Sequence, residues 1–362
     1  MDSLDQLLNL WDFERAAEAV LEPMAWRYYS GAAGDERTLR ENRLAFERRR
    51  LRPRVLVDVG CRSLATTVLG RPTSWPVLVA PMAFHGLACG EAEAATARAA
   101  AAQGTVFCVS TMANLPLERV RAAAPEARQW FQLYVQRDRG VTAELVRRAA
   151  AAGYEALVVT VDAPALGRRE ADLRHGFSLP AHLTPGNLEL GDAALLAGTA
   201  DARSALAAQF SASTDPSMTW RDFGWLRSLS PLPIVLKGVL HPDDARRAAD
   251  EGVDAVVVSN HGGRQLDGAI ASLDALPAVA AAAGGGLEVL LDGGIRRGTD
   301  VLTALALGAR AVLLGRPVLW GLAVAGEAGA ARVLSLLRDE VDLALALTGC
   351  TSPAEVTGDL LG

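Results

Sequence analysis

Short runs of apolar residues, each ending in a polar or glycine-containing segment, recur along the chain and predict buried β-strands. Most runs are followed by a stretch rich in alanine, leucine, arginine and glutamate, which is typical of helices; residues 91–103 and 242–251 are examples. Strands that alternate with helices indicate a parallel sheet with helical crossovers. The predicted strands are residues 77–80, 106–109, 130–135, 156–161, 234–236, 255–258, 289–291 and 311–314.

Eight strand–helix units in one chain of 362 residues match a (β/α)8 TIM barrel better than the alternative, an open doubly wound sheet. We therefore expect an α/β fold in which residues 1–362 form a single domain and residues 76–350 form the barrel. Residues 1–75 are expected to be an N-terminal helical cap. Within it, residues 4–21 have an amphipathic helical pattern, and residues 23–34 predict a second short helix ending at a glycine.

One long stretch, residues 179–218, departs from this rhythm between the fourth and fifth predicted strands. Prolines and glycines interrupt it throughout, and it shows no strand pattern. An insertion at the carboxyl end of a barrel strand more often carries function than packing, so a lid loop is predicted. The alternative is a disordered surface excursion.

Composition and charge are those of a globular enzyme. Half of the residues are hydrophobic, and the formal net charge of −6 without a basic cluster gives no support for nucleic-acid binding. No uncharged apolar segment reaches the roughly 20 residues of a membrane helix, and the first residues lack the pattern of a signal peptide. The four cysteines are far apart and have no metal-ligand spacing, so we expect a reducing, cytoplasmic environment and no metal site.

Active sites of such barrels lie at the carboxyl ends of the strands, so the residues there are candidate site residues. Nearly every predicted strand ends in a donor, an acceptor or a charge, although any single one could be a satisfied polar group at the end of an element. In chain order these residues are Pro81, Met82, Ala83, Ser110, Gln132, Tyr134, Thr160, Asp162, Lys237, Ser259, His261, Asp292, Gly293, Gly294, Arg296, Gly315 and Arg316.

The segment 259–267, Ser-Asn-His-Gly-Gly-Arg-Gln-Leu-Asp, carries the most specific chemistry. It follows a buried strand and places an imidazole, His261, and a guanidinium, Arg264, at the strand's mouth. An imidazole can move a proton near neutral pH, and a guanidinium can hold a carboxylate with two hydrogen bonds. This pairing suggests chemistry on a small acid.

Glycine-rich loops after the last two predicted strands indicate a phosphate site, with Arg296 and Arg316 as charged partners. Lys237, on the fifth strand, would reach the centre of the barrel and could stabilise a developing negative charge. No Gly-x-Gly-x-x-Gly motif follows an early strand, so a Rossmann-type nicotinamide site is not supported.

Together these motifs resemble the FMN-dependent L-2-hydroxy acid oxidases, the family of glycolate and lactate oxidases. The resemblance covers residues 10–350, and its most specific motifs are residues 160–169, 259–267, 291–300 and 315–317. Residues 268–277 and 318–324 look closest to the bacterial lactate oxidases.

The resemblance implies that FMN lies across the barrel mouth. Its phosphate would be held by the loop 292–296 and by Gly315 and Arg316. Lys237 would stabilise negative charge on the reduced ring. The ring would contact Pro81, Met82, Ala83, Ser110, Gln132, Thr160, Lys237 and Ser259.

It also implies roles around the substrate. Arg169, Arg264 and Tyr28 would bind the substrate carboxylate, and Tyr134 would hydrogen-bond the substrate hydroxyl. His261 would be the general base, and Asp162 would stabilise its imidazolium form. Free imidazole titrates at a pKa of about 6.5, so a neutral base is available at pH 7.

The implied activity is oxidation of a short L-2-hydroxy acid, with L-lactate as the first candidate, to the 2-oxo acid, while oxygen is reduced to hydrogen peroxide. The alternatives are a glycolate, longer-chain or aromatic (mandelate-type) acid, a dehydrogenase with another electron acceptor, a lactate monooxygenase, and a non-catalytic flavin- or phosphate-binding protein. Ala83 favours an oxidase, because some of the related dehydrogenases and a monooxygenase carry glycine there. The resemblance also implies a homotetramer.

Two departures from the family pattern stand out. Met112 lies where plant-type glycolate oxidases carry tryptophan, and a flexible methionine predicts a wider pocket that would fit lactate or longer side chains. The usual His-Pro-Glu-Gly-Glu after the first strand is replaced by Cys89-Gly90-Glu91-Ala92-Glu93.

Overall fold

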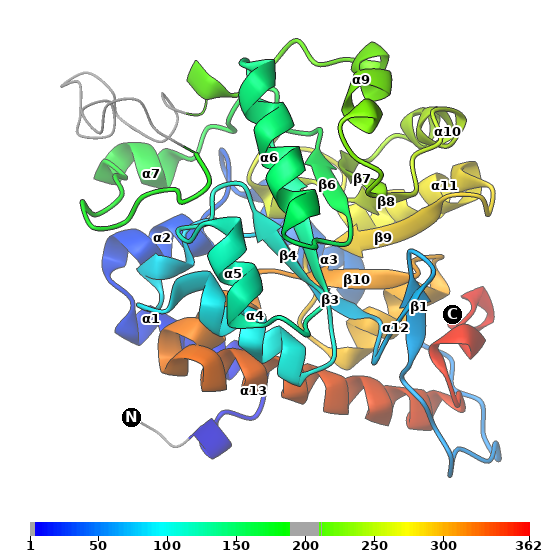
Figure 1. The fold of residues 1–362 in the computed structure, drawn as a ribbon. Coiled ribbons are helices and arrows are strands. Elements are labelled where there is room, and N and C mark those ends of the chain that lie inside the picture. The colour runs from blue at the N-terminus through cyan, green and yellow to red at the C-terminus, as the bar shows by residue number, and fades with distance from the viewer. Residues whose placement is uncertain (1–3, 189–209, 211) are drawn as a thin grey trace.

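The computed structural model describes residues 4–188, 210 and 212–362, and shows a closed barrel of eight parallel strands (Figure 1). Strands adjacent in sequence are adjacent in the barrel, and the last strand closes it by pairing with the first. All eight predicted strands are confirmed, with ends that differ by at most three residues. The strands are β3 (Val77–Val79), β4 (Phe107–Ser110), β5 (Gln129–Leu133), β6 (Leu157–Thr160), β7 (Ile234–Val239), β8 (Ala255–Val258), β9 (Glu288–Asp292) and β10 (Ala311–Leu314).

Helices surround the barrel, as the alternating pattern predicts. The predicted helices at 91–103 and 242–251 are α4 and α10, each ending within a residue of its expected limit. The helices that follow the cap are α4 (Ala92–Ala102), α5 (Leu117–Ala123), α6 (Arg139–Ala151), α7 (Glu170–His175), α9 (Phe223–Ser228), α10 (Pro242–Asp250), α11 (Ser272–Ala283), α12 (Gly298–Ala306) and α13 (Arg316–Thr348).

The interior of the barrel has an apolar lower layer and a polar upper layer. Side chains alternate across a strand, so every second residue points inside. Val235 belongs to the buried interior cluster, and Lys237, two residues later on β7, lines the mouth. On five other strands, an apolar residue of the interior cluster is likewise followed two residues later by a polar residue at the upper end. These pairs are Cys108 and Ser110, Trp130 and Gln132, Val158 and Thr160, Val257 and Ser259, and Leu290 and Asp292.

A two-stranded hairpin that the sequence patterns did not predict packs against the opposite, amino-terminal end of the barrel. Its antiparallel strands are β1 (Thr66–Val68) and β2 (Arg71–Thr73). Val68 is fully buried in the interior cluster, and the backbone N–H of Leu69 donates to the Glu288 carboxylate at 2.8 Å. The hairpin therefore closes the end of the barrel that faces away from the site.

The N-terminal cap contains three helices, α1 (Leu10–Val20), α2 (Pro23–Ser30) and α3 (Arg37–Glu47). The helix predicted over 4–21 is interrupted, because the Asn9 side chain accepts the N–H groups of Trp11 and Asp12 and starts α1 there. A short 3-10 helix, η1 (Leu4–Gln6), precedes it. The helix predicted over 23–34 ends at Ser30, and α3 was not predicted at all.

The predicted lid, residues 179–218, is only partly described. Residues 189–209 and 211 lie outside the described residues, so this part of the lid remains a prediction. From the described part, Phe210 is buried and its ring meets that of Tyr134 edge-on, with centroids 5.0 Å apart.

Among the described residues, only α13 is long and apolar enough to match a membrane span. Half of its most apolar stretch is buried, and the helix packs against α1, α4 and α12. It also kinks at Gly326, whose φ is +57°. These contacts are those of a core helix in a globular fold.

The structure shows what the retained glutamate of the altered motif after β3 does. The Glu93 carboxylate is fully buried and accepts the backbone N–H groups of His85, Asn114 and Leu115. It therefore ties the loop after β3 to the loop after β4. Ala92, where the family usually has glycine, adopts a left-handed φ of +48°.

We predict that Ala92→Gly stabilises the protein. An L-residue in the left-handed region costs about 1 kcal/mol, which glycine avoids. Ala94→Gly, on the same helix but without a positive φ, is the matched control and should destabilise by about 0.5–1 kcal/mol. Thermal unfolding of both holoproteins measures the two shifts, and a lower midpoint for Ala92→Gly would contradict the strain at this position.

Candidate active site

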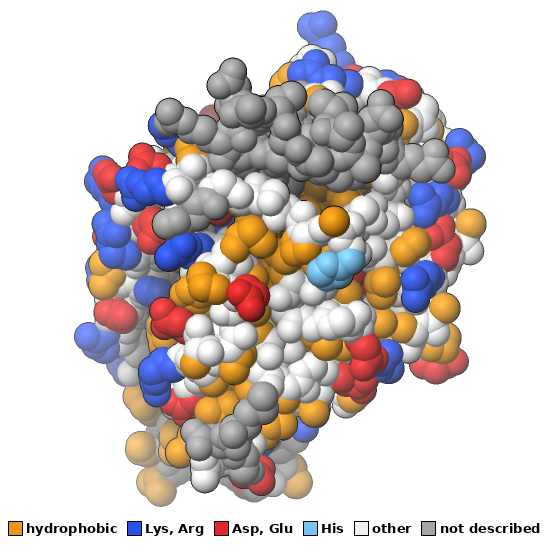
Figure 2. All heavy atoms as spheres, turned by 90° about the vertical axis from the view of Figure 1, so that its left-hand side faces the viewer, with side chains coloured by type: hydrophobic (Ala, Val, Ile, Leu, Met, Phe, Trp, Pro, Cys, Tyr) orange, Lys and Arg blue, Asp and Glu red, His pale blue; other side chains and the backbone are white. Residues whose placement is uncertain are grey.

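A pocket opens at the carboxyl end of the barrel, with about 1160 Å³ of empty space counted out to the solvent at its mouth. Figure 2 views the molecule from the side on which α1, α2 and α7 lie. Hydrophobic side chains and white atoms, which are backbone and uncharged polar side chains, fill much of the centre of this face, and charged side chains lie mostly toward its rim. The pocket is lined by nineteen of the predicted site residues, namely Tyr28, Pro81, Met82, Ala83, Ser110, Met112, Gln132, Tyr134, Thr160, Arg169, Lys237, His261, Arg264, Asp292, Gly293, Gly294, Arg296, Gly315 and Arg316.

The other two predicted site residues, Asp162 and Ser259, do not line the pocket but contact residues that do. Ser259 is fully buried and its hydroxyl accepts a hydrogen bond from the Lys237 ammonium at 2.9 Å. Asp162 pairs with His261. The structure thus brings every predicted site residue to one end of the barrel.

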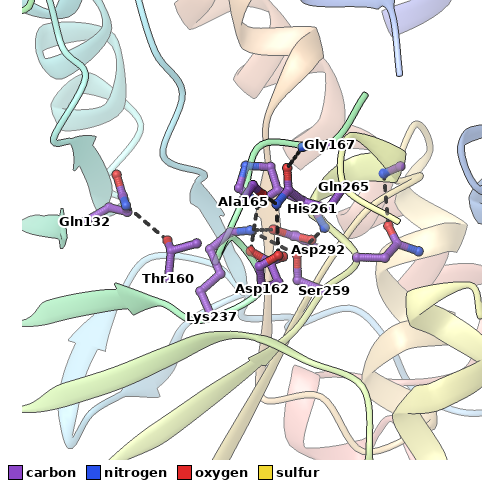
Figure 3. A network of polar contacts seen from close by, with 12 residues as sticks. Gln132, Thr160, Asp162, Ala165, Gly167, Lys237, Ser259, His261, Gln265 and Asp292 are labelled. Carbon is purple, nitrogen blue, oxygen red and sulfur yellow. Dashed lines mark hydrogen bonds and ion pairs between the residues drawn. The ribbon is translucent and has the colours of Figure 1, made fainter. Parts of the chain in front are cut away.

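Lys237 is the buried cation at the centre of the site (Figure 3). Its ammonium lies 2.8 Å from the Asp292 carboxylate across the barrel. Burial lowers the pKa of Lys237, but the carboxylates of Asp292 and Asp162 outweigh it and hold the pKa above its usual value. Lys237 therefore stays positively charged.

A second, uncharged network lies on the neighbouring strands. The Gln132 amide donates to the Thr160 hydroxyl at 3.0 Å (Figure 3). The amide oxygen of Gln132 accepts a hydrogen bond from the Ser110 hydroxyl at 3.1 Å. These side chains offer fixed donors and acceptors without charge, which suits recognition of a polar aromatic ring edge.

His261 is held by a strained turn at the end of β8. Its φ is +60°, in the left-handed region that histidine adopts only at some cost, and two positive-φ glycines follow it. The Asn260 side chain accepts the Gly263 N–H, and the Ser259 hydroxyl accepts the His261 N–H. The turn points the imidazole into the pocket.

The Nδ1 of His261 lies 3.0 Å from an Asp162 carboxylate oxygen (Figure 3). The carboxylate accepts the proton on Nδ1, so Nε2 is the nitrogen left to act as an acceptor. Burial lowers the pKa of His261, assisted by the charges of Lys237 and Arg169 and opposed by Asp162. His261 is thus neutral at pH 7. Burial also disfavours the Asp162 carboxylate, but His261 and Lys237 hold its pKa below its usual value.

Two guanidinium groups face the pocket; that of Arg169 lies 4.0 Å from the Asp172 carboxylate, whereas that of Arg264 forms no ion pair within the described residues. Arg264 donates to the backbone carbonyls of Tyr28 and Gly31, and its guanidinium carbon lies 4.9 Å from the Tyr28 ring centroid. Arg169 is buried, and its Nε has no hydrogen-bond partner among the described residues. Burial and the charge of Arg264 lower the pKa of Arg169 to about 10. A carboxylate bound between the two would hydrogen-bond to both and offset part of their combined positive charge.

The glycine-rich loops form a second cationic corner. Arg316 donates to the backbone carbonyls of Tyr29, Gly31 and Gly262, and burial with the charges of Arg264 and Arg296 lowers its pKa to about 9. Burial also lowers the pKa of Arg296 to about 10. Arg296 is buried and Arg316 is partly buried, and positive charge removed from water in this way favours binding of an anion.

Glycine is required on the backbone of this corner. Gly294 has a φ of +88°, and a Cβ there would lie 2.3 Å from the Asn42 carbonyl oxygen. Gly315 is less constrained, because a Cβ there would make only ordinary van der Waals contact, the nearest with the Met82 sulfur at 3.7 Å. The loop is thus tightly held on one side and open toward the pocket on the other.

The comparison with protein families decides the identity of this site, since the model of the FMN-dependent dehydrogenases matches residues 17–362. The chain belongs to the FMN-dependent dehydrogenase family. FMN is therefore the cofactor of this barrel.

Relatives of this FMN-dependent dehydrogenase include well-known oxidases. The chain is 53% identical to an L-lactate oxidase of Nostoc sp., with both chains fully covered, and 48% identical to glycolate oxidase 3 of Oryza sativa subsp. indica over 98% of this chain and 96% of the relative. The structure of mandelate oxidase with (S)-4-hydroxymandelic acid superposes with a TM-score of 0.92 at 44% identity, covering 98% of each chain.

The residues present in this family member fit FMN. The Arg296 Nε and the Asp292 Oδ1 are buried, and neither has a hydrogen-bond partner within residues 4–188, 210 and 212–362. A donor and an acceptor left open beside a cationic, glycine-lined corner suit a phosphate and a polyhydroxylated chain.

Sequence reasoning missed Tyr29, Leu166 and Phe210, which also line the pocket. The Tyr29 hydroxyl donates to the Phe84 carbonyl at 2.5 Å, which fixes α2 to the loop after β3. Tyr29 is adjacent to the predicted Tyr28, and Leu166 lies inside the 160–169 motif, so the sequence contained a pattern that could have pointed to both. Phe210 had none, because its neighbourhood shows no pattern.

We predict that Asp162→Asn lowers the pKa of His261 further. The carboxylate favours the imidazolium, and an amide removes that attraction while keeping the shape. The titration of His261 is measured by NMR on protein labelled with 15N-histidine. The chain has five histidines, so only five imidazole signals must be resolved. The control is Asp243→Asn beside exposed His241, which should leave His261 unchanged. An unchanged or higher His261 pKa in Asp162→Asn would show that the pair is not coupled.

Proposed function

We propose that this protein is an FMN-dependent L-2-hydroxy acid oxidase that converts L-lactate to pyruvate and reduces oxygen to hydrogen peroxide. The observation that carries the proposal is the neutral His261, paired with Asp162, in a pocket that also holds the guanidiniums of Arg169 and Arg264, whose two positive charges are met by a single carboxylate, that of Asp172 at 4.0 Å from Arg169. A 2-hydroxy acid needs both features at once: a cationic clamp for its carboxylate and a base for its hydroxyl.

Arg169 and Arg264 bind the substrate carboxylate. Two guanidiniums fix the plane of a carboxylate, so that one face of the substrate carbon is presented for reaction. Tyr28 lies against both arginines, with centroid distances of 4.9 Å and 6.0 Å, and stacks on Phe177 at 4.3 Å. It limits their movement from the side away from the barrel.

His261 Nε2 takes the proton of the substrate hydroxyl, and Asp162 stabilises the imidazolium that results. Burial above all raises the pKa of Tyr134, so its phenol stays protonated and can donate a hydrogen bond to the substrate oxygen. When bound, FMN supplies the acceptor for the hydrogen and electron pair that leave the substrate carbon.

The remaining residues hold the cofactor. Arg296, Arg316 and the backbone of Gly293, Gly294 and Gly315 would hold the phosphate. The ammonium of Lys237 stays charged and would favour negative charge on the flavin ring. The Ser259 hydroxyl accepts a hydrogen bond from this ammonium and holds it in position. The ring would lie against Pro81, Met82, Ala83, Ser110, Gln132 and Thr160.

Oxygen as the electron acceptor is supported by the relatives, which are named as oxidases, and by Ala83. We also propose a homotetramer, on the family resemblance. A cytoplasmic location is supported by the four cysteines, all of which are free thiols.

A larger substrate is the second candidate, and the lining of the pocket favours it. Met112, Leu166 and Phe210 present apolar side chains next to Tyr134, where the substrate side chain would lie. A methionine and a leucine can move aside for a longer or aromatic group. The structural relative that binds 4-hydroxymandelic acid is consistent with this second candidate.

We predict that L-lactate bleaches the bound flavin under anaerobic conditions and that the wild type then forms peroxide in air. His261→Gln should retain FMN but lose kcat by about 10²–10⁴-fold, the usual contribution of a general base. The measurement is stopped-flow absorbance of the flavin, and near-normal reduction in the variant would exclude His261 as the base. If none of lactate, glycolate, 2-hydroxyoctanoate and mandelate bleaches the flavin of the wild type, the proposed function is wrong.

We predict that Met112→Trp narrows the substrate range. The indole would fill the space beside Leu166 and Phe210, so kcat/KM for 2-hydroxyoctanoate should fall at least about tenfold relative to glycolate, as expected for the loss of methylene contacts. Steady-state kinetics with both acids measures the ratio. Met112→Leu, which conserves volume, is the control and should preserve it.

A further inference from the structure

The second cationic corner, formed by Arg296, Arg316 and the glycine-rich loops, is connected to the N-terminal helix α1 through stacked side chains. The Arg296 guanidinium carbon lies 4.7 Å from the Trp320 ring centroid and 5.4 Å from the Trp11 ring centroid. Trp320 lies near the start of the long helix α13, whereas Trp11 lies in the first turn of α1. Two helices far apart in sequence therefore supply the surroundings of one guanidinium.

Arg296 depends on these rings because little else holds its side chain. Its Nη1 donates to the carbonyl of the adjacent Ile295, and its Nε has no partner among the residues that the structure describes. Glu14 is the acidic residue that raises the pKa of Arg296 most, yet the two form no ion pair within the described residues. A buried guanidinium with so few hydrogen bonds is oriented mainly by the aromatic faces beside it.

Trp11 is itself fixed on a second side by Arg43. The Arg43 guanidinium carbon lies 5.4 Å from the Trp11 ring centroid, and its Nη1 donates to the Gly294 carbonyl and to the Asp300 carboxylate. Asp300 accepts the backbone N–H groups of Arg296 and Arg297. The same glycine loop that would hold the phosphate is thus tied to α1 through Arg43 and Trp11.

We propose that Trp11 is a positioning residue for cofactor binding: it orients Arg296 toward the FMN phosphate and so makes α1 part of the cofactor site. The proposal rests on FMN as the cofactor but not on the identity of the substrate. Trp11 does not touch the pocket itself, and it acts through Arg296.

The decisive comparison is between FMN and riboflavin, which has the same ring and ribityl chain but no phosphate. Dissociation constants are measured on full-length protein from the recovery of flavin fluorescence on dilution, after loading with FMN or with riboflavin. Trp11→Leu should weaken FMN binding about tenfold, as expected for the loss of a desolvated cation–π contact, and should leave riboflavin binding within twofold. Trp11→Phe, which keeps an aromatic face, should weaken FMN binding only about twofold to fourfold.

The matched control is Trp225→Leu. Trp225 also stacks on an arginine, Arg139, at 4.5 Å, but neither residue lines the pocket. This variant should bind both flavins as the wild type does.

The proposal would be overturned if Trp11→Leu bound FMN as strongly as the wild type does. It would also be overturned by an equal loss of affinity for FMN and riboflavin, because that is what a merely structural role of Trp11 predicts. Should Trp11→Leu fail to fold, Trp11→Phe decides: no loss specific to FMN would overturn the proposal as well. None of these titrations contains a hydroxy acid, so a wrong substrate assignment would not affect their outcome.

Discussion

The structure of the site depends on positive charge buried at the mouth of the barrel. Lys237, Arg169 and Arg296 are buried and Arg316 is partly buried; removal from solvent lowers the pKa of all three arginines, and the one ion pair that they make within the described residues, Arg169 with Asp172 at 4.0 Å, does not reverse this. Burying such charges without partners is costly unless a ligand supplies the counter-charge. The pocket is therefore complementary to anions, namely a phosphate in one corner and a carboxylate in the other.

Lys237 shows how the barrel tolerates one such charge permanently. Strands β7 and β9 are both neighbours of β8, and their inward residues place Lys237 and Asp292 within 2.8 Å of each other. This internal ion pair makes the lysine independent of the ligand, and its raised pKa follows. The arginines lie on loops and helices farther out, where hydrogen bonds to carbonyls hold them in place but do not cancel their charge.

The sequence predicted the barrel and its polar mouth because both follow from local patterns. Apolar runs marked all eight strands, and the polar residues at their carboxyl ends, among them Gln132, Thr160 and Lys237, marked the mouth. The hairpin β1–β2 was missed because each strand has only three residues and is stabilised by burial of Val68 in the barrel. Helix α3 was missed because its sequence, Arg-Thr-Leu-Arg-Glu-Asn-Arg-Leu-Ala-Phe-Glu, is mostly polar, and its contacts with the 3-10 helix η5 (His261–Gly263) are long-range. The structure places all predicted site residues at the mouth, while their individual roles remain predictions.

The N-terminal helices supply contacts to the site that the barrel alone cannot provide. Strand ends can deliver polar side chains inward, but they cannot cover the outer sides of long guanidinium groups that extend beyond the barrel rim. The carbonyls of Tyr28, Tyr29 and Gly31 at the end of α2 accept the hydrogen bonds of Arg264 and Arg316, and Trp11 of α1 stacks on Arg296. The cap thus removes water from around these cations, so that each keeps a stronger attraction for an anion in the pocket than it would in solvent.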